Sequence, residues 1–165
     1  MVLGLWVKLR RRGSKPCPFC NVTDGPNFKV VTEDEKYTMF VDRTPAASEH
    51  YLVIPKAHLE SIRDLRKNDV HIVKDLWEMG ERYFDTKNVP KEQRRFGFHI
   101  PPFTSVDHLH LHCFVLPFKD MIREHKYRAT RRNNSVYVKG WGWFIEVEQT
   151  IHVLERGGRV GFAPC

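Results

Sequence analysis

Three histidines alternate with two leucines near the middle of the chain. They lie between Asp107 and Phe114, where the sequence reads Asp-His-Leu-His-Leu-His-Cys-Phe. Successive side chains of an extended strand point to opposite faces, so Leu109 and Leu111 are expected to bury in a core. The opposite face would then present three imidazoles, those of His108, His110 and His112. Three imidazoles on one face indicate a nucleotide or metal site.

Strand geometry predicts different roles for these rings. An extended chain rises roughly 3.3 Å per residue, so the backbones of the outer pair lie about 13 Å apart, whereas zinc holds ligand nitrogens about 2.0 Å away. One ion therefore cannot bind all three. Neighbouring rings are about 6.6 Å apart, so one can bind a metal while the next stays free. The alternative is a strand whose polar face merely carries histidines.

The cysteines also suggest a metal. Cys17 and Cys20 form Cys-Pro-Phe-Cys, whereas Cys113 and Cys165 are isolated, so the chain lacks the disulfide framework of small secreted domains. A redox role for Cys-x-x-Cys needs a thioredoxin-like strand and helix around it, and here an irregular stretch follows. Zinc is favoured, provided that two more ligands exist.

Composition predicts one soluble globular domain. The 165 residues are 41% hydrophobic, which is enough for a single core. The longest apolar stretches fall far short of the roughly 20 residues that cross a bilayer, and no signal peptide is visible, so we expect no membrane partner and a cytoplasmic or nuclear location. Residues 1–23 contain five basic side chains and no acid. This segment weakly resembles a mitochondrial presequence but is more typical of a basic tail.

A formal charge of +7 suits a polyanionic ligand, either a small phosphate compound or a nucleic acid. Besides the N-terminal tail, the basic residues concentrate between Lys119 and Lys139. Such a run is usually a solvated loop, and a nucleic-acid contact surface is the alternative.

Hydrophobic periodicity predicts a meander of strands followed by one long helix. The strand-like segments cover residues 28–31, 36–42, 51–54, 96–100, 109–116 and 141–147. From Asn68, a reasonable N-cap, to about Thr86, apolar residues recur at intervals of three and four. That helix must lay its apolar stripe on the sheet. A short helical stretch to Arg156 ends the pattern.

Taken together, the motifs resemble the histidine triad (HIT) superfamily. Residues 108–114 are similar to its His-φ-His-φ-His-φ-φ signature, where φ is apolar. Its Cys-x-x-Cys, nucleoside-binding and His-x-Leu-Val-Ile-Pro-Lys-x-His segments are matched, in the family's order, by residues 17–20, 40–42 and 50–58. Gly97-Phe-His99-Ile-Pro-Pro and Trp143-Phe-Ile145 resemble the aprataxin-related Hint nucleotide phosphoramidases.

The resemblance covers roughly residues 17–117, which we assign as the HIT core domain. Residues 1–16 form the basic N-terminal tail, and residues 118–165 form a C-terminal extension expected to pack on the same domain. The family implies an α+β fold with an antiparallel sheet of about five strands and one long helix, to which the short C-terminal helix is added. It also implies a homodimer whose sheets join.

The resemblance further implies nucleotidyl transfer to water. By position, His110 matches the nucleophile that attacks the α-phosphorus of a nucleoside 5′-phosphoramidate and forms a nucleotidyl-histidine. An unperturbed imidazole pKa near 6.5 leaves a free lone pair at pH 7, which suits this role. The groups that would contact phosphate or the leaving amine are His112, Ser105 and His99. His50 matches an additional histidine that supports the triad.

Nucleoside and metal sites are implied in the same way. Phe40 and Asp42 match the positions that pack against a purine and bind the ribose hydroxyls, so the expected partner is a purine nucleotide such as an AMP conjugate. The remaining motif residues would form a closed, structural zinc site made of Cys17, Cys20, His58 and His108. No organic cofactor is expected.

Three classes of function stay open. The first is an adenosine 5′-monophosphoramidase, supported by the triad and Ser105. The second is aprataxin-like removal of AMP from adenylated nucleic-acid ends, which the charge favours; against it, the segment after residue 117 lacks the cysteines of an appended Cys2His2 finger. The third is a non-catalytic nucleotide-binding module, which would not require His110. Dinucleoside polyphosphate hydrolysis is a weaker enzymatic variant.

Overall fold

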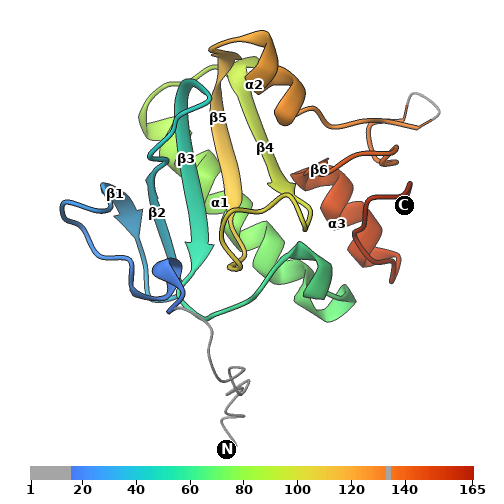
Figure 1. The fold of residues 1–165 in the computed structure, drawn as a ribbon, viewed down its shortest axis with the longest axis horizontal. Helices are drawn as coiled ribbons and strands as arrows, with labels where there is room; N and C mark the ends of the chain where they lie inside the picture. The colour runs from blue at the N-terminus through green and yellow to red at the C-terminus, as the bar shows by residue number, and fades with distance from the viewer. Residues whose placement is uncertain (1–15, 133–134) are drawn as a thin grey trace, which may run out of the picture.

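The computed structural model describes residues 16–132 and 135–165, and its centre is one antiparallel sheet. The six strands follow the order β1-β2-β3-β5-β4-β6, and every neighbouring pair is antiparallel (Figure 1). Their bounds are β1 Val30–Glu33, β2 Tyr37–Val41, β3 Ala47–Pro55, β4 Arg94–His99, β5 Leu111–Phe118 and β6 Phe144–Glu146.

Helices cover one face of this sheet. In Figure 1, α1 (Val70–Thr86) crosses behind the strands, and α3 (Val147–Glu155) lies beside it, while α2 (Met121–Lys126) follows β5 beyond the end of that strand. Single 3-10 turns complete the helical segments: η1 Pro18–Asn21, η2 Ile62–Asp64, η3 Lys67–Asp69 and η4 Lys91–Gln93. The apolar side of α1 packs with Leu109 and Leu111 in the main core. The opposite face of the sheet is therefore left to carry the histidines.

Alternation along the central strands separates the two faces. On β3, Tyr51 and Val53 join the core beneath α1, whereas Leu52 and Ile54 belong to a smaller cluster on the other face. His112 of β5 pairs with Leu52 of β3 and with Gly97 of β4. A Cβ atom at Gly97 would lie 2.5 Å from the Phe144 ring and the Ile145 carbonyl, so glycine is required for β6 to approach β4.

The predicted α+β class is confirmed, with differences at the edges of elements. The sheet has six strands rather than about five, because β6 pairs with residues 97–99 of β4. The long helix begins at Val70, not after an Asn68 cap, because the Asp69 carboxylate accepts the Arg66 N–H at 2.8 Å and closes a separate turn. His108 and His110 precede β5, which starts at Leu111.

The basic run from Lys119 to Lys139 is not a uniformly solvated loop. Asp120 caps α2 by accepting the Arg123 N–H at 2.8 Å. Tyr127 is buried, and Lys139 is completely buried, with its ammonium donating to the carbonyls of Gly140 and Phe162. Tyr127 and Lys139 therefore anchor the described part of the run to the domain, while Arg123, Lys126, Arg128, Arg131 and Arg132 are exposed.

The expected N-terminal tail, including the weak presequence resemblance, lies outside the described residues except for Pro16. Among the residues that the structure describes, no helix has both the length and the apolar character to cross a membrane.

Candidate active site and metal cluster

A cavity of about 530 Å³ opens on the face of the sheet opposite α1. The predicted residues that line it are Phe40, Asp42, His99, Ser105, His110 and His112. Strands β2, β4 and β5 carry three of them, Phe40, His99 and His112. Asp42 directly follows β2, Ser105 comes from the loop after β4, and His110 directly precedes β5. The structure thus gathers the predicted nucleoside-binding and triad residues around one pocket.

His110 is held as a neutral ring with one free nitrogen. Its Nδ1 lies 2.6 Å from the carbonyl oxygen of His108. A carbonyl can only accept, so Nδ1 carries the proton and Nε2 keeps its lone pair. Burial lowers the pKa of His110, while the charge of Asp42 raises it to a smaller extent. At neutral pH the ring is unprotonated at Nε2, as a nucleophile must be.

His112 presents the opposite chemistry to the same pocket. The Ala46 N–H donates to His50 Nδ1 at 3.3 Å, and His50 Nε2 lies 2.9 Å from His112 Nδ1. His50 must therefore donate from Nε2, which places the proton of neutral His112 on Nε2. That atom is buried and has no partner among the described residues. The His112 Nε2–H is available to a ligand oxygen.

Burial keeps both of these rings neutral. It lowers the pKa of His50 to about 4, although nearby Asp42 acts in the opposite direction. It lowers the pKa of His112 well below 6.5, and the neighbouring histidines add to this effect. The predicted supporting role of His50 thus has a concrete form, because its ring fixes the tautomer of His112. His50 itself lies behind His112 and does not line the cavity.

Asp42 and Phe40 bring a carboxylate and an aromatic ring to the cavity. The backbone N–H and hydroxyl of Thr44 donate to Asp42 Oδ1 at 2.7 and 3.2 Å, which orients the carboxylate. The Phe40 ring meets the rings of Phe19 and Phe28 edge-on, at centroid distances of 5.3 and 5.2 Å. A carboxylate next to an aromatic cluster can accept ribose hydroxyls while a base packs on the rings.

His99 and Ser105 also line the cavity. His99 Nε2 is 3.3 Å from the carbonyl oxygen of Lys126, so it carries the proton, and Nδ1 is an acceptor. Burial lowers the pKa of His99 to about 4. The ring is therefore suited to accept a hydrogen bond rather than to donate one to phosphate. Ser105 is exposed on the cavity wall, where its hydroxyl can both donate and accept.

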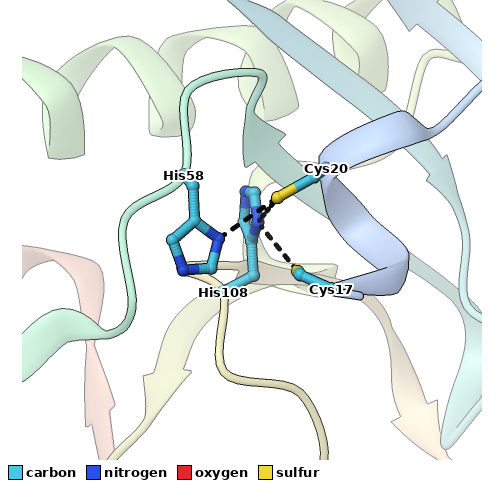
Figure 2. A group of neighbouring side chains, drawn as sticks. All are labelled: Cys17, Cys20, His58 and His108. Atoms are coloured by element: carbon cyan, nitrogen blue, oxygen red, sulfur yellow. Dashed lines mark hydrogen bonds between the residues drawn. The ribbon is translucent and has the colours of Figure 1, made fainter. Parts of the chain in front are cut away.

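The four predicted metal ligands form a separate cluster beside the pocket. Figure 2 shows Cys17 and Cys20, at the η1 turn, facing the rings of His58 and His108. Cys17 Sγ lies 3.4 Å from His108 Nδ1, Cys20 Sγ lies 3.8 Å from the same atom, and Cys20 Sγ lies 3.2 Å from His58 Nδ1. All four ligand atoms are within 4.8 Å of one another.

These distances match the edges of a zinc tetrahedron. Zn–S bonds of about 2.3 Å and Zn–N bonds of about 2.05 Å place sulfur and nitrogen roughly 3.6 Å apart. His108 Nε2 donates to the Pro55 carbonyl at 2.8 Å, which leaves Nδ1 unprotonated and directed at the cysteines. Burial lowers the pKa of His108 to about 4, which keeps this nitrogen available as a ligand. The donor set therefore fits a metal ion.

Comparison with known proteins identifies the family of the chain. Residues 16–128 match the family model described as "Scavenger mRNA decapping enzyme C-term binding". The chain is 42% identical over 144 residues to the bifunctional adenosine 5′-phosphosulfate phosphorylase/adenylylsulfatase HINT4 of Arabidopsis thaliana, covering 86% of this chain and 92% of the relative. It is 37% identical over 159 residues to the adenosine 5′-monophosphoramidase HINT3 of Xenopus tropicalis, covering 92% and 95%.

The chain belongs to the histidine triad superfamily. This histidine triad protein is of the Hint type and is related to aprataxins: it is 26% identical to the aprataxin of Ciona intestinalis over 79% of this chain and 33% of that protein. Among solved structures, a histidine triad protein from Clostridium difficile superposes with a TM-score of 0.56 at 24% identity, covering 68% of this chain and all of that one. The latter match supports the fold.

Sequence reasoning about this histidine triad protein missed several pocket residues. Phe19 and Phe28 contact the Phe40 ring, and Lys126 and Tyr127 also line the pocket. Phe19 stands between the two cysteines of the motif, so a metal at η1 would also position its ring. The position of Phe19 between these cysteines is the one signal in the sequence that could have indicated its place in the pocket. Lys126 and Tyr127 reach the pocket only because α2 folds back from β5.

Proposed function

We propose that this protein hydrolyses nucleoside 5′-phosphoramidates, and AMP conjugates in particular, through a nucleotidyl-histidine intermediate. One observation carries the proposal. The lone pair of His110 Nε2 and the N–H of His112 Nε2 are set in one pocket by hydrogen bonds on the far sides of their rings. Nucleophile and phosphate donor are thus preorganised before substrate arrives. The relatives named as phosphoramidase and adenylylsulfatase support the same chemistry.

The first step forms the intermediate. His110 Nε2 attacks the α-phosphorus, a new N–P bond forms, and the P–N bond to the leaving amine breaks with its electron pair going to the amine. The His112 Nε2–H donates to a non-bridging oxygen, where negative charge must be held. The departing nitrogen takes a proton through the exposed hydroxyl of Ser105, which recovers one from water. In the second step water attacks phosphorus, and the electron pair of the breaking N–P bond returns to His110 Nε2 as AMP is released. The proton that the water loses goes to solvent and neutralises the hydroxide left in the first step.

The proposal includes a structural zinc ion in the cluster of Cys17, Cys20, His58 and His108. Two thiolates and two neutral imidazoles are a common zinc set, and four protein ligands leave no open position for water. When bound, the ion would cross-link η1 to the segment before β5 and would supply no reactive group. The measured separations of the ligand atoms support it.

A direct comparison of substrates tests the function. AMP joined to the lysine amine and 5′-adenylated DNA are compared under steady-state conditions with the same enzyme preparation. We expect efficient release of AMP from the phosphoramidate and much slower release from DNA. Efficient turnover of DNA alone would contradict the proposal, as would full activity in the His110→Ala protein.

Aprataxin-like removal of AMP from nucleic acid is the second candidate. The observation that favours it is the position of Lys126, which lines the catalytic cavity, and of Arg128, which follows closely. Neutralising Arg128, Arg131 and Arg132 together separates the candidates. If the basic face is only solvated, kcat/KM for a phosphoramidate with an uncharged leaving amine should be nearly unchanged at 150 mM salt, where the Debye length is about 8 Å. If the face binds phosphate, the triple variant should bind nucleic acid more weakly. The dependence of its affinity on salt concentration should then fall by about one phosphate contact for each arginine removed.

We also propose the homodimer that the family resemblance implies. Residues 94–96 of β4 pair with β5 in the described structure, and β6 occupies the other side of β4 only at residues 97–99. Part of this sheet edge is therefore open to a second copy. Light scattering of the full chain tests the proposal, and a monomeric mass at micromolar concentration would contradict it.

A further inference from the structure

A second cavity, of about 630 Å³, adjoins the catalytic pocket. The two cavities share four lining residues: His99, Phe103, Ser105 and Lys126. The rest of the second cavity comes mainly from residues 125–130 and 141–144, within the C-terminal extension. No step of the proposed mechanism places a part of the substrate in this second cavity.

The shared residues define where the second cavity lies relative to the reacting phosphorus. Phe19, Phe28, Phe40 and Asp42 line the catalytic pocket and not the second cavity. A nucleotide with its base and ribose at those residues therefore directs its phosphate towards the shared wall. In a displacement at phosphorus the leaving group departs roughly in line, away from the attacking nitrogen. The leaving group is the part of the substrate that would enter the second cavity.

Charge in the second cavity selects a class of leaving group. Lys126 and Arg128 line it together with His125, and no carboxylate occurs among its described lining residues. In the described part of the chain no ion pair is recorded for either Lys126 or Arg128. Uncompensated cations in a concave surface attract anions and disfavour a cationic group such as a free lysine side chain.

Aromatic rings form the remaining wall. Trp141 is 63% exposed and Phe103 is 58% exposed although both are large and apolar. The second tryptophan of the wall, Trp143, lies 4.8 Å from Phe103 and is stacked on Phe162 at 4.2 Å, measured between ring centroids. The Thr130 hydroxyl donates to the Trp141 carbonyl at 2.5 Å and anchors this segment. Exposed rings on a rigid backbone offer a stacking surface to a planar ligand.

We propose that the second cavity is the leaving-group site, in which Arg128 and Trp141 select a leaving group that carries both a negative charge and a planar ring. This inference rests on the proposed function, because it assigns the half of the substrate that the catalytic pocket does not hold. An aromatic amino acid linked through its amine, with a free carboxylate, has this chemistry. A mononucleotide linked through its 5′-phosphate has it as well.

The test uses matched substrates with the full-length protein. AMP is joined through its phosphorus to the α-amine of tryptophan, of tryptophan amide and of alanine, and in a further arm to a mononucleotide through a pyrophosphate. We expect kcat/KM for the tryptophan conjugate to exceed that for its neutral amide about tenfold, with Arg128→Gln reducing this ratio to about twofold. Trp141→Ala should remove most of the preference for tryptophan over alanine.

Control variants remove the same groups elsewhere. Arg82→Gln neutralises an exposed arginine of α1, and Tyr137→Ala removes an exposed ring of the C-terminal extension outside both cavities. Neither should change the substrate ratios. Equal kcat/KM for the tryptophan conjugate and its amide would overturn the proposal. So would a ratio of these two values that Arg128→Gln leaves unchanged. A charge effect confined to the mononucleotide arm assigns the site to nucleotides, and one confined to the tryptophan arm assigns it to amino acids.

Binding to a protein without the nucleophile separates this proposal from the proposed function. In the His110→Ala protein, calorimetry compares AMP with the intact AMP–tryptophan conjugate. We expect the conjugate to bind about tenfold tighter, and Arg128→Gln to remove most of that gain. If wild-type protein fails to turn over any conjugate but this difference appears, the function is wrong and the site is right. Equal affinities for AMP and the conjugate would refute the site.

Discussion

His108 and His110 are two residues apart, yet they present different ring nitrogens, one to the cysteines of the metal cluster and the other to the catalytic pocket. His108 donates from Nε2 to the Pro55 carbonyl and offers Nδ1 to the cysteines. His110 donates from Nδ1 to the His108 carbonyl and offers Nε2 to the catalytic pocket. Burial lowers the pKa of both rings, so each keeps one lone pair at neutral pH.

The difference lies in the carbonyl that each ring meets. An imidazole in a buried site has one donor and one acceptor, and the partner of one nitrogen decides the role of the other. One carbonyl comes from the end of β3 and the other from the chain just before β5. The roles proposed for His108 in the metal cluster and for His110 in catalysis therefore need no difference in side-chain chemistry.

Removal of His110 is the strongest test of this division. His110→Ala should lower kcat for AMP phosphoramidates by at least about four powers of ten, because the covalent route is lost. The fold and AMP affinity should be largely retained. The matched control is His71→Ala, an exposed histidine of α1. Steady-state rates and circular dichroism check the pair, and a rate within tenfold of wild type would place the nucleophile elsewhere.

Disruption of the metal cluster should affect stability more than chemistry. Metal analysis of purified protein should give about one zinc per chain. Cys17→Ser should lose it and lower Tm by more than about 10 °C, because the ion cross-links η1 to the segment before β5. Below that Tm, kcat should stay within about tenfold of wild type. Cys165→Ser serves as the control and should melt like wild type. If the purified protein contained no metal and its Tm did not change when a chelator was added, the proposed zinc site would be wrong.

The relay behind His112 predicts a smaller catalytic effect. His50→Ala removes the N–H that points at His112 Nδ1, so the proton of His112 is no longer confined to Nε2. We expect kcat to fall about 10- to 100-fold while KM changes less than about threefold, since the lost contact acts mainly in the transition state. A rise in KM at constant kcat would mean that His50 shapes the nucleoside site instead.

Acid should destabilise the fold through the same buried rings. Burial lowers the pKa of His50 and of His99 to about 4 in the folded protein. The unfolded chain takes up protons near pH 6.5, so this stability is present above that pH and is lost as pH falls towards 4. His99→Asn should reduce the loss between pH 7.5 and 5.5 by about 1 kcal/mol. Urea unfolding at both pH values measures it, and an unchanged loss would contradict the buried neutral state.

Much of the site could be predicted because its residues are local in sequence. Period two at residues 108–112 places Leu109 and Leu111 in the core, and both are buried. The segments around Cys17, Phe40 and His50 identify side chains that the structure brings to one face of the sheet or to the adjoining metal cluster. The long helix follows from periodicity in the same way, whereas the α+β fold was implied by the family resemblance. Local patterns suffice here because burial repeats along each element.

Other features depend on contacts between distant segments, and only the tertiary structure decided them. The sequence cannot show which groups face each ring: the tautomers of His108 and His112 are set by partners on β3, and that of His110 by the local fold of residues 108–110. Phe28 and Lys126 enter the pocket from segments with no motif. The sixth strand forms because Gly97 lets Phe144 approach. The sequence by itself determined the chemical groups, and packing determined which lone pair and which proton each one presents.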